Sequence, residues 1–302
     1  MIRVENISHS YGEVQALRDI SFEVKKGQIF GLIGPDGAGK TTLIRILTTL
    51  ILADQGTAFI DGMEVQKEYK KIRSQIGYMP GRFSLYEDLS ILENLNLFAA
   101  IFGTTLDENY HLIEDIYKQI EPFKHRRAGQ LSGGMKQKLA LSCAMIHAPN
   151  VIFLDEPTTG VDPVSRKEFW QMLKTLKERG ITILVSTPYM DEAAMCSEVA
   201  LIHDGQFLDI DTPEKIISKY KPLLYRAKSS KNNALLKEIR NSGWTKSAYL
   251  NGEFVHFTVE DLNDVNKIRV FIQKQEIEIM EFKEVNPSIE DCFMDLMHSP
   301  TE

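Results

Sequence analysis

Gly34-Pro35-Asp36-Gly37-Ala38-Gly39-Lys40-Thr41 fits the pattern G-x-x-x-x-G-K-[ST], a glycine-rich loop that wraps around phosphate groups. Residues 28–33, just ahead of it, are short and apolar enough for a buried strand. Residues 42–47, just behind it, are typical of a helix start. A strand, a loop and a helix in this order are the context that the motif needs, so a chance match of a glycine-rich turn is the weaker interpretation.

Each part of this stretch has a physical task at a phosphate. Glycines let the backbone curl so that successive N–H groups point at one anion. The helix that follows adds its unpaired N–H groups and the positive end of its dipole. Lys40 is predicted to neutralise the outer phosphates, and the Thr41 hydroxyl to bind Mg²⁺. The candidate phosphate-binding residues are Gly34, Pro35, Asp36, Gly37, Ala38, Gly39, Lys40, Thr41 and Thr42.

Composition limits the classes of protein that the chain can belong to. Its 302 residues suit one large or two ordinary domains, and 35 Lys and Arg against 42 Asp and Glu give a net charge of −7. That balance argues against a nucleic-acid groove, which needs a basic face. The three cysteines (Cys143, Cys196 and Cys292) are widely spaced and form no disulfide or zinc pattern, which favours a reducing cytosol. No apolar run reaches the ~20 residues of a membrane span.

The order of the predicted elements indicates an α/β fold. Residues 2–33 alternate as antiparallel strands do, with Tyr11 in a turn between two of them. Residues 85–147 have helical spacing and form a predicted insertion. The continuous apolar run at 151–154 predicts a strand buried on both faces, and an amphipathic helix is expected over 169–179, stopped by Gly180. From about residue 221 the composition shifts toward a small α+β unit. We therefore expect one domain over 1–220 and an accessory domain over 221–302.

Two further motifs belong to the predicted core. Asp155 and Glu156 end the strand at 151–154, where carboxyl ends of strands face a ligand. Asp155 is suited to holding Mg²⁺ and Glu156 to taking a proton from water, although acids also simply begin loops. Ser132, Gly133 and Gly134 form a second glycine-rich turn that opens a helix. It can bind an anion, or Ser132 can act only as a helix cap.

Over about residues 1–220, the sequence resembles the ATP-binding cassette (ABC) ATPases. Residues 34–41 are similar to the Walker A loop, residues 151–156 to Walker B, and residues 131–137 to the family signature; we name Ser132, Gly133 and Gly134 the signature turn. Tyr11 stands where the family has an aromatic ring on adenine, although a tyrosine in a turn also has a plainer explanation. Residues 286–293 resemble the C-terminal extension of bacterial drug and polysaccharide exporters.

The resemblance implies a P-loop NTPase core with an antiparallel β subdomain and a helical insertion, which binds ATP with Mg²⁺ at Thr41 and Asp155 and hydrolyses it with Glu156 and Lys40. It implies a head-to-tail pair of cassettes, as a homodimer or with a better-equipped second chain. Each nucleotide is then held between one chain's Walker motifs and the other's signature turn. Residues 159–162 resemble the loop that passes between the two chains, and residues 82–94 the part that touches a membrane permease. The expected location is cytoplasmic, at the inner face of the membrane, with no nucleic-acid partner.

Three positions depart from the family pattern. Gly81 stands where the family has a glutamine that contacts magnesium and water, and Pro188 where it has a histidine on the γ-phosphate. Neither residue supplies that side chain, and proline has no backbone N–H. Asp36 replaces a common asparagine and brings a carboxylate near phosphate. We call the nucleotide site formed by this chain's own Walker motifs the home site, and the cavity at it the home cavity. Either the home site hydrolyses ATP slowly and the signature turn completes a site on a partner chain, or other residues have replaced these contacts.

Two classes of function remain open from the sequence. The first is the ATPase subunit of a membrane transporter, most consistent with an exporter because of the C-terminal extension. The second is a cassette protein that acts on ribosomes or DNA, or a nucleotide-gated switch with little hydrolysis. The single cassette and the acidic balance argue against the second class. His256 and Trp244 are expected to be packing or surface residues rather than site residues.

Overall fold

The computed structural model describes residues 1–275 and 277–298, and the chain divides into two compact units, Met1–Pro213 and Glu214–Glu302. The boundary predicted at residue 220 falls just after helix α7 (Pro213–Lys219). Within the second unit, the Cys292 thiol lies 3.8 Å from the carbonyl oxygen of Ile216 in α7. The role of the second unit stays a prediction.

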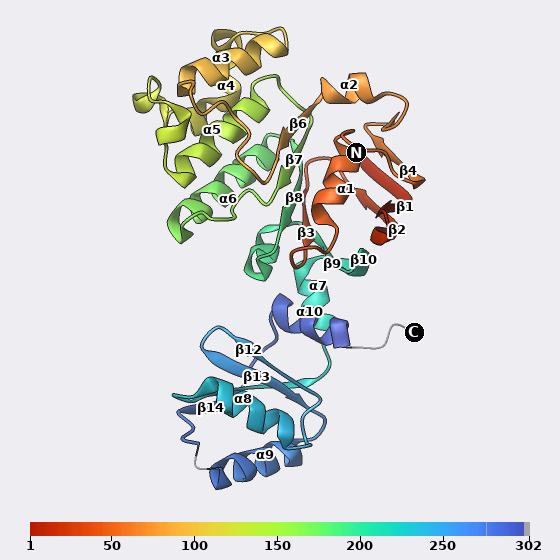
Figure 1. Ribbon diagram of the computed structural model, residues 1–302, viewed down its shortest axis with the longest axis vertical. Helices are drawn as coiled ribbons and strands as arrows, with labels where there is room; N and C mark the ends of the chain where they lie inside the picture. Colours follow the sequence, from red (N-terminus) through yellow and green to blue (C-terminus); the bar gives the residue numbers. More distant parts are fainter. Residues whose placement is uncertain (276, 299–302) are drawn as a thin grey trace. The chain divides into compact units, whose positions relative to one another are not determined.

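The first unit is built on a six-stranded sheet in the order β10-β9-β3-β8-β7-β6 (Figure 1). Its strands are β3 (Ile29–Ile33), β6 (Ile76–Met79), β7 (Val151–Asp155), β8 (Thr182–Thr187), β9 (Glu198–His203) and β10 (Gln206–Asp211). All pairs are parallel except β9 with β10. Every residue of β3, β7 and β8 is buried, as expected for parallel strands covered on both faces. The carboxyl ends of these three central strands therefore meet at one edge.

A second, antiparallel sheet has the order β2-β1-β4-β5. It contains β1 (Ile2–Tyr11), β2 (Val14–Val24), β4 (Gln55–Ile60) and β5 (Met63–Glu64). Alternate residues of β1 and β2 are buried, which is the pattern of strands that face a core on one side. Their buried side chains join Phe30 and Leu32 of β3 in one hydrophobic cluster. This confirms the predicted antiparallel system. Tyr11 was predicted to lie in the turn, but it is the last residue of β1, where it pairs with Val14 of β2, and the turn begins at Gly12.

Helices of the first unit pack on the central sheet or form the predicted insertion. Helix α1 (Lys40–Leu47) contacts β7, and α6 (Pro163–Glu178) contacts β3 and β8. The insertion contains α3 (Ile91–Ile101), α4 (Leu106–Tyr117) and α5 (Gly133–Met145), which lie together beside the sheet (Figure 1). The remaining short elements are α2 (Tyr69–Arg73), η1 (Glu121–Phe123), η2 (Ala128–Gln130) and η3 (Met190–Met195).

The second unit is a four-stranded antiparallel sheet in the order β12-β13-β11-β14, formed by a β-α-β-β-α-β chain. This is the split β-α-β arrangement of ferredoxin-like folds. Its elements are β11 (Leu223–Lys228), α8 (Asn232–Asn241), β12 (Ser247–Asn251), β13 (Phe254–Val259), α9 (Leu262–Lys274), β14 (Glu281–Glu284) and α10 (Ile289–His298). Buried residues of α8 and α9 share one cluster with Ala227 and Phe257 of the sheet. The predicted α+β extension is confirmed.

Candidate functional site

The loop at 34–41 joins β3 to α1 at the carboxyl edge of the central sheet (Figure 1). Gly37 and Gly39 have φ angles of 82° and 104°, which favour glycine. A Cβ atom on Gly34 would lie 2.2 Å from the carbonyl oxygen of Ile202 in the neighbouring β9. Glycine at these positions therefore fixes both the curl of the loop and its close packing on the sheet.

Lys40 is folded into this loop and only 3% exposed. Its Nζ donates to the carbonyl oxygens of Gly34 and Pro35, at 2.8 and 2.9 Å. The same ammonium lies 3.2 Å from Oε1 of Glu156. The predicted phosphate-binding cation and the predicted general base thus form an ion pair, so an incoming phosphate competes with Glu156 for Lys40.

Asp155 and Thr41 also meet, from β7 and α1. The Thr41 hydroxyl donates to Oδ1 of Asp155 at 3.0 Å, and the Ser186 hydroxyl donates to the same oxygen at 2.7 Å. Ser186 in β8 further accepts from the backbone N–H of Glu156, at 3.0 Å. Glu156 itself has a φ of 49°, which a non-glycine residue adopts at an energetic cost. Ser186 was not predicted, because nothing in its local sequence distinguishes it from other strand residues.

A cavity of about 780 Å³ opens over the loop. Eight predicted residues line it: Tyr11, Asp36, Gly37, Gly39, Lys40, Thr41, Thr42 and Glu156. Gly34, Pro35 and Ala38 complete the loop without lining the cavity. Tyr11 is 48% exposed and packs edge-on against His9, with 4.7 Å between ring centroids. Arg18 and Asp204 also line the cavity. They could not be predicted from the sequence, because they reach the loop only through the pairing of segments that are far apart in the chain.

The signature turn lies elsewhere in the first unit. Ser132 caps helix α5, where its hydroxyl accepts from the N–H of Met135 at 3.4 Å. Neither Ser132, Gly133 nor Gly134 lines the cavity that contains Lys40. If this turn binds nucleotide, it does so at a site completed by another chain.

Mg²⁺ is the metal that the oxygen groups of this site fit. Thr41 and Asp155 offer a hydroxyl and a carboxylate, which are hard ligands that suit magnesium. In the part of the chain that the structure describes, no group of three or more His, Cys, Asp and Glu side chains is arranged to hold a metal. A magnesium ion at Thr41 and Asp155 therefore depends on further oxygens from phosphate and water.

The three departures from the family pattern all lie at or beside this site, and Asp36 lines its cavity. A Cβ on Gly81 would be 3.1 Å from the carbonyl oxygen of Asp155 and 3.8 Å from its Oδ2. Pro188 directly follows Thr187, whose carbonyl accepts from the N–H of Gly34 at 3.3 Å. The side chains that are absent would thus have stood beside the magnesium ligand and the start of the phosphate loop.

Comparison with known proteins agrees with this geometry. The sequence profile described as "ABC transporter" matches residues 17–159. The Probable multidrug ABC transporter ATP-binding protein YbhF of Escherichia coli is 37% identical over 286 residues, which are 93% of this chain and 49% of that protein. The chain thus spans about half of that relative. The Linearmycin resistance ATP-binding protein LnrL of Bacillus subtilis is 32% identical over 261 residues, covering 85% of this chain and 82% of that protein.

Solved structures are similar as well. The dimeric post-hydrolysis structure of the ATP-binding cassette MJ0796, bound to ADP and Pi, has a TM-score of 0.64 and 28% identity, and covers 70% of this chain and 98% of that one. Fold, site and relatives together show that this chain belongs to the ABC transporter ATP-binding proteins. Within residues 1–275 and 277–298, no helix is both long and apolar enough to cross a membrane.

Proposed function

We propose that this chain is the MgATP-hydrolysing subunit of a transporter, located at the cytoplasmic face of the membrane, and that it drives a separate permease. The observation that carries the proposal is that Lys40, Thr41 and Glu156 line one cavity large enough for a nucleotide, with Asp155 hydrogen-bonded to Thr41 beneath it. The names of the two relatives, a probable multidrug transporter protein and a linearmycin resistance protein, support export as the direction.

The chain's own residues have distinct tasks in hydrolysis. Backbone N–H groups of the loop and Lys40 bind the triphosphate, and Tyr11 offers a ring on which the base can stack. Magnesium at Thr41 and Asp155 would neutralise developing phosphate charge. Glu156, released from Lys40 by the phosphate, accepts the proton of the attacking water.

The same geometry supports a slow home site. Gly81 and Pro188 supply no side-chain donor beside Asp155 and the loop, and loss of one donor to a transition state typically costs a hundred-fold or more in rate. A signature turn that lies away from the home cavity is suited to completing a partner's site, in a homodimer or with a better-equipped cassette.

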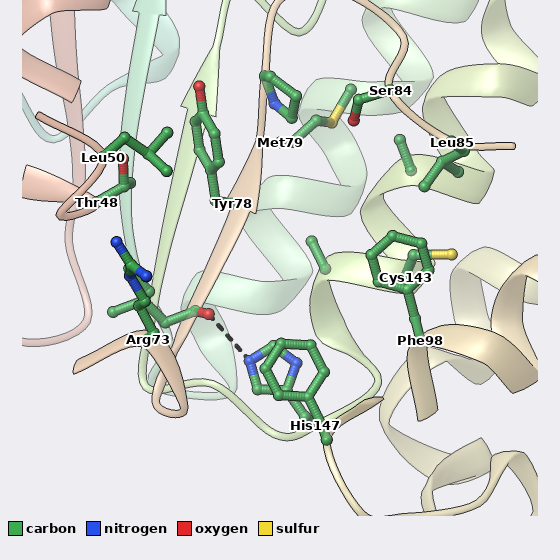
Figure 2. A pocket seen from close by; sticks show the side chains of 15 residues that line it. Thr48, Leu50, Arg73, Tyr78, Met79, Ser84, Leu85, Phe98, Cys143 and His147 are labelled. Carbon is green, nitrogen blue, oxygen red and sulfur yellow. Dashed lines mark hydrogen bonds between the residues drawn. The ribbon is translucent and has the colours of Figure 1, made fainter. Parts of the chain in front are cut away.

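A second cavity, of about 280 Å³, supports docking of the permease (Figure 2). Ser84 and Leu85, from the predicted contact segment 82–94, line it together with Phe98 and Phe102 of the helical insertion. His147 stacks on Phe102 with 3.7 Å between centroids, and burial lowers the pKa of His147, which favours its neutral form. We propose that a short, largely apolar segment of the permease occupies this cavity.

Steady-state ATPase measurements on the full chain test the proposal. Lys40→Met and Glu156→Gln are each expected to lower turnover at least a hundred-fold, with loss of nucleotide affinity only in Lys40→Met. A multi-span membrane protein that co-purifies with the chain supports transport. Co-purification of ribosomal RNA without a membrane protein, or turnover that survives Lys40→Met, would overturn it.

A further inference from the structure

Glu192 is a buried carboxylate that the site described above does not use. It lies in η3, which follows β8, and it is 3% exposed. Its Oε2 accepts from the hydroxyl of Thr158, at 3.1 Å, in a contact where both side chains are buried. Its Oε1 is buried without a hydrogen-bond partner. A buried carboxylate oxygen without a hydrogen bond costs free energy, so simple packing does not account for this side chain.

Thr158 belongs to the segment at 157–162, which follows the predicted general base and ends at the N-cap of α6. Its neighbour Thr159 donates to Oε2 of Glu156 at 3.4 Å. On the other side, a Cβ on Gly133 would lie 3.7 Å from the carbonyl oxygen of Gly160. This segment therefore touches both the base of the home site and the signature turn, which we assign to a partner's site.

The other carboxylate oxygen of Glu192 faces Arg166 of helix α6. Arg166 of α6 places its Nε 3.8 Å from Oε1 of Glu192, too far for a hydrogen bond. The guanidinium also stacks over the ring of Tyr189, at 4.7 Å, and pairs with Asp191 at 3.4 Å. Tyr189 directly follows Pro188, the position where the family's γ-phosphate contact is absent. Arg166 and Glu192 both line a surface cavity of about 260 Å³, which leaves Arg166 room to move.

We propose that Glu192 is a positioning residue for hydrolysis, acting through Thr158. The hydrogen bond fixes the position of the segment at 157–162 relative to the end of β8. Because this segment contacts Glu156 and the signature turn, the bond also fixes the orientation of the Glu156 carboxylate and the position of the signature turn. This inference rests on the proposed ATPase function and adds a residue that touches neither nucleotide nor metal. Glu192 acts on the rate of the chemical step, so its loss changes kcat while nucleotide binding stays as it was.

Three variants of the full chain test this. Thr158→Val has nearly the shape of threonine and removes only the donor, and Thr158→Ser restores it. Thr175→Val is the matched control, because the Thr175 hydroxyl donates only to Gln171 within α6, away from the site. We expect Thr158→Val to lower kcat about 10-fold, which corresponds to ~1.4 kcal/mol, with KM and nucleotide affinity within about twofold of wild type. Thr158→Ser and Thr175→Val should match wild type.

Each outcome decides the matter. If the wild-type chain shows no turnover that depends on Lys40, the proposed function fails. If it does turn over and Thr158→Val is as fast, only the present inference fails. If Thr158→Val lowers kcat, nucleotide affinity and melting temperature together, the hydrogen bond between Thr158 and Glu192 only stabilises the fold, and the inference fails. Should Thr158→Val not fold, Glu192→Leu and Glu192→Gln decide together, because only the amide oxygen of the glutamine still accepts from Thr158. A loss of kcat in Glu192→Leu that Glu192→Gln does not share supports the proposal, and equal kcat in the two variants overturns it.

Discussion

Under the proposed function, single residues near the phosphate loop should set the rate of hydrolysis. Gly81 lies beside Asp155, the predicted magnesium ligand, and Pro188 lies near the start of the loop; neither offers a side-chain donor. We expect the double variant Gly81→Gln with Pro188→His to raise kcat at least about 10-fold, because each new side chain can stabilise charge that develops on phosphate. Steady-state ATPase of the full chain measures this.

A control is needed because any side chain at 81 meets the backbone of Asp155 at 3.1 Å, a tight contact that must relax by a few tenths of an ångström. Gly81→Ala with Pro188→His carries the same Cβ without the amide. If the glutamine variant is no faster than wild type while the alanine variant folds normally, other residues have replaced the two contacts.

Residue types reveal a site only where spacing is fixed by local backbone. Lys40 and Thr41 were predictable because the loop and helix set their positions within eight residues. Asp155 followed from its place at the end of an apolar strand. Ser186 and Arg18 were not predictable from the sequence. Ser186 bonds to Asp155, and Arg18 lines the cavity, only because long-range pairing brings β8 and β2 beside the loop. His256, expected to be a packing or surface residue, is buried and hydrogen-bonded in the second unit.

At the scale of elements, the sequence predicted whether a segment is a helix or a strand better than it predicted the first and last residues of the element. The helix expected over 169–179 begins at Pro163, because Asp162 caps it by accepting from the N–H groups of Val164 and Ser165. Residues 163–168 are exposed or half-buried, so the amphipathic pattern starts only at Phe169. The order of strands in the second unit was also beyond prediction, since it depends on pairing between distant segments.

The buried side-chain amide of Asn94 makes four of the hydrogen bonds that hold the segment at 82–94, and the shape of the segment should depend on them. Asn94 Nδ2 donates to the carbonyls of Tyr86, Leu89 and Ser90, and its Oδ1 accepts from the N–H of Tyr86 at 3.1 Å. Asn94→Ala is expected to destabilise this segment by about 2 kcal/mol and to speed hydrogen exchange there, with nucleotide affinity unchanged. Asn109→Ala, which removes the amide bonded to Ile146 in the same insertion, is the control. Unchanged exchange at Tyr86 would contradict this.

Helix α10 is joined to its sheet by a charged hydrogen-bond network. Burial raises the pKa of Asp291, but hydrogen bonds from His256, Ser288 and Tyr249 outweigh it and lower the pKa to about 2. Because the pKa of Asp291 is lower in the folded state than in the unfolded state, its ionised carboxylate stabilises the fold above pH ~3.8. This contribution, roughly 2 kcal/mol in all, is lost as the pH falls toward 2. We expect amides of α10 to lose protection in this pH range.

Hydrogen exchange at several pH values measures the loss. Asp291→Asn should remove the pH-dependent part and already weaken α10 at pH 7. Glu253→Gln serves as the control, because Glu253 is an exposed partner of Lys228 in the same unit. Equal pH dependence in Asp291→Asn and wild type would show that other groups govern α10.

At the scale of the whole molecule, we proposed that the signature turn, which does not line the cavity over the phosphate loop, completes a nucleotide site on a second chain. If the pair is a head-to-tail homodimer, two differently damaged chains must complement each other. Lys40→Met disables the phosphate loop and keeps the turn. Gly133→Asp places a carboxylate at the turn, where the residue has an ordinary φ and an acid is tolerated at a helix start, so the chain folds but repels phosphate.

Each variant alone should be inactive, because both of its composite sites contain a damaged part. Mixing them in equal amounts creates mixed pairs, in which one site combines the intact loop of one chain with the intact turn of the other. These intact sites make up about a quarter of all sites in the mixture. ATPase activity should therefore return on mixing and rise with protein concentration. It should be absent when the Gly133→Asp chain also carries Glu156→Gln, and persist when the Lys40→Met chain carries that change. Activity that stays absent in a mixture shown by native mass spectrometry to contain mixed pairs would exclude the pair of two copies as the catalytically active head-to-tail form. Pairing with a different cassette would then be the arrangement that the signature turn serves.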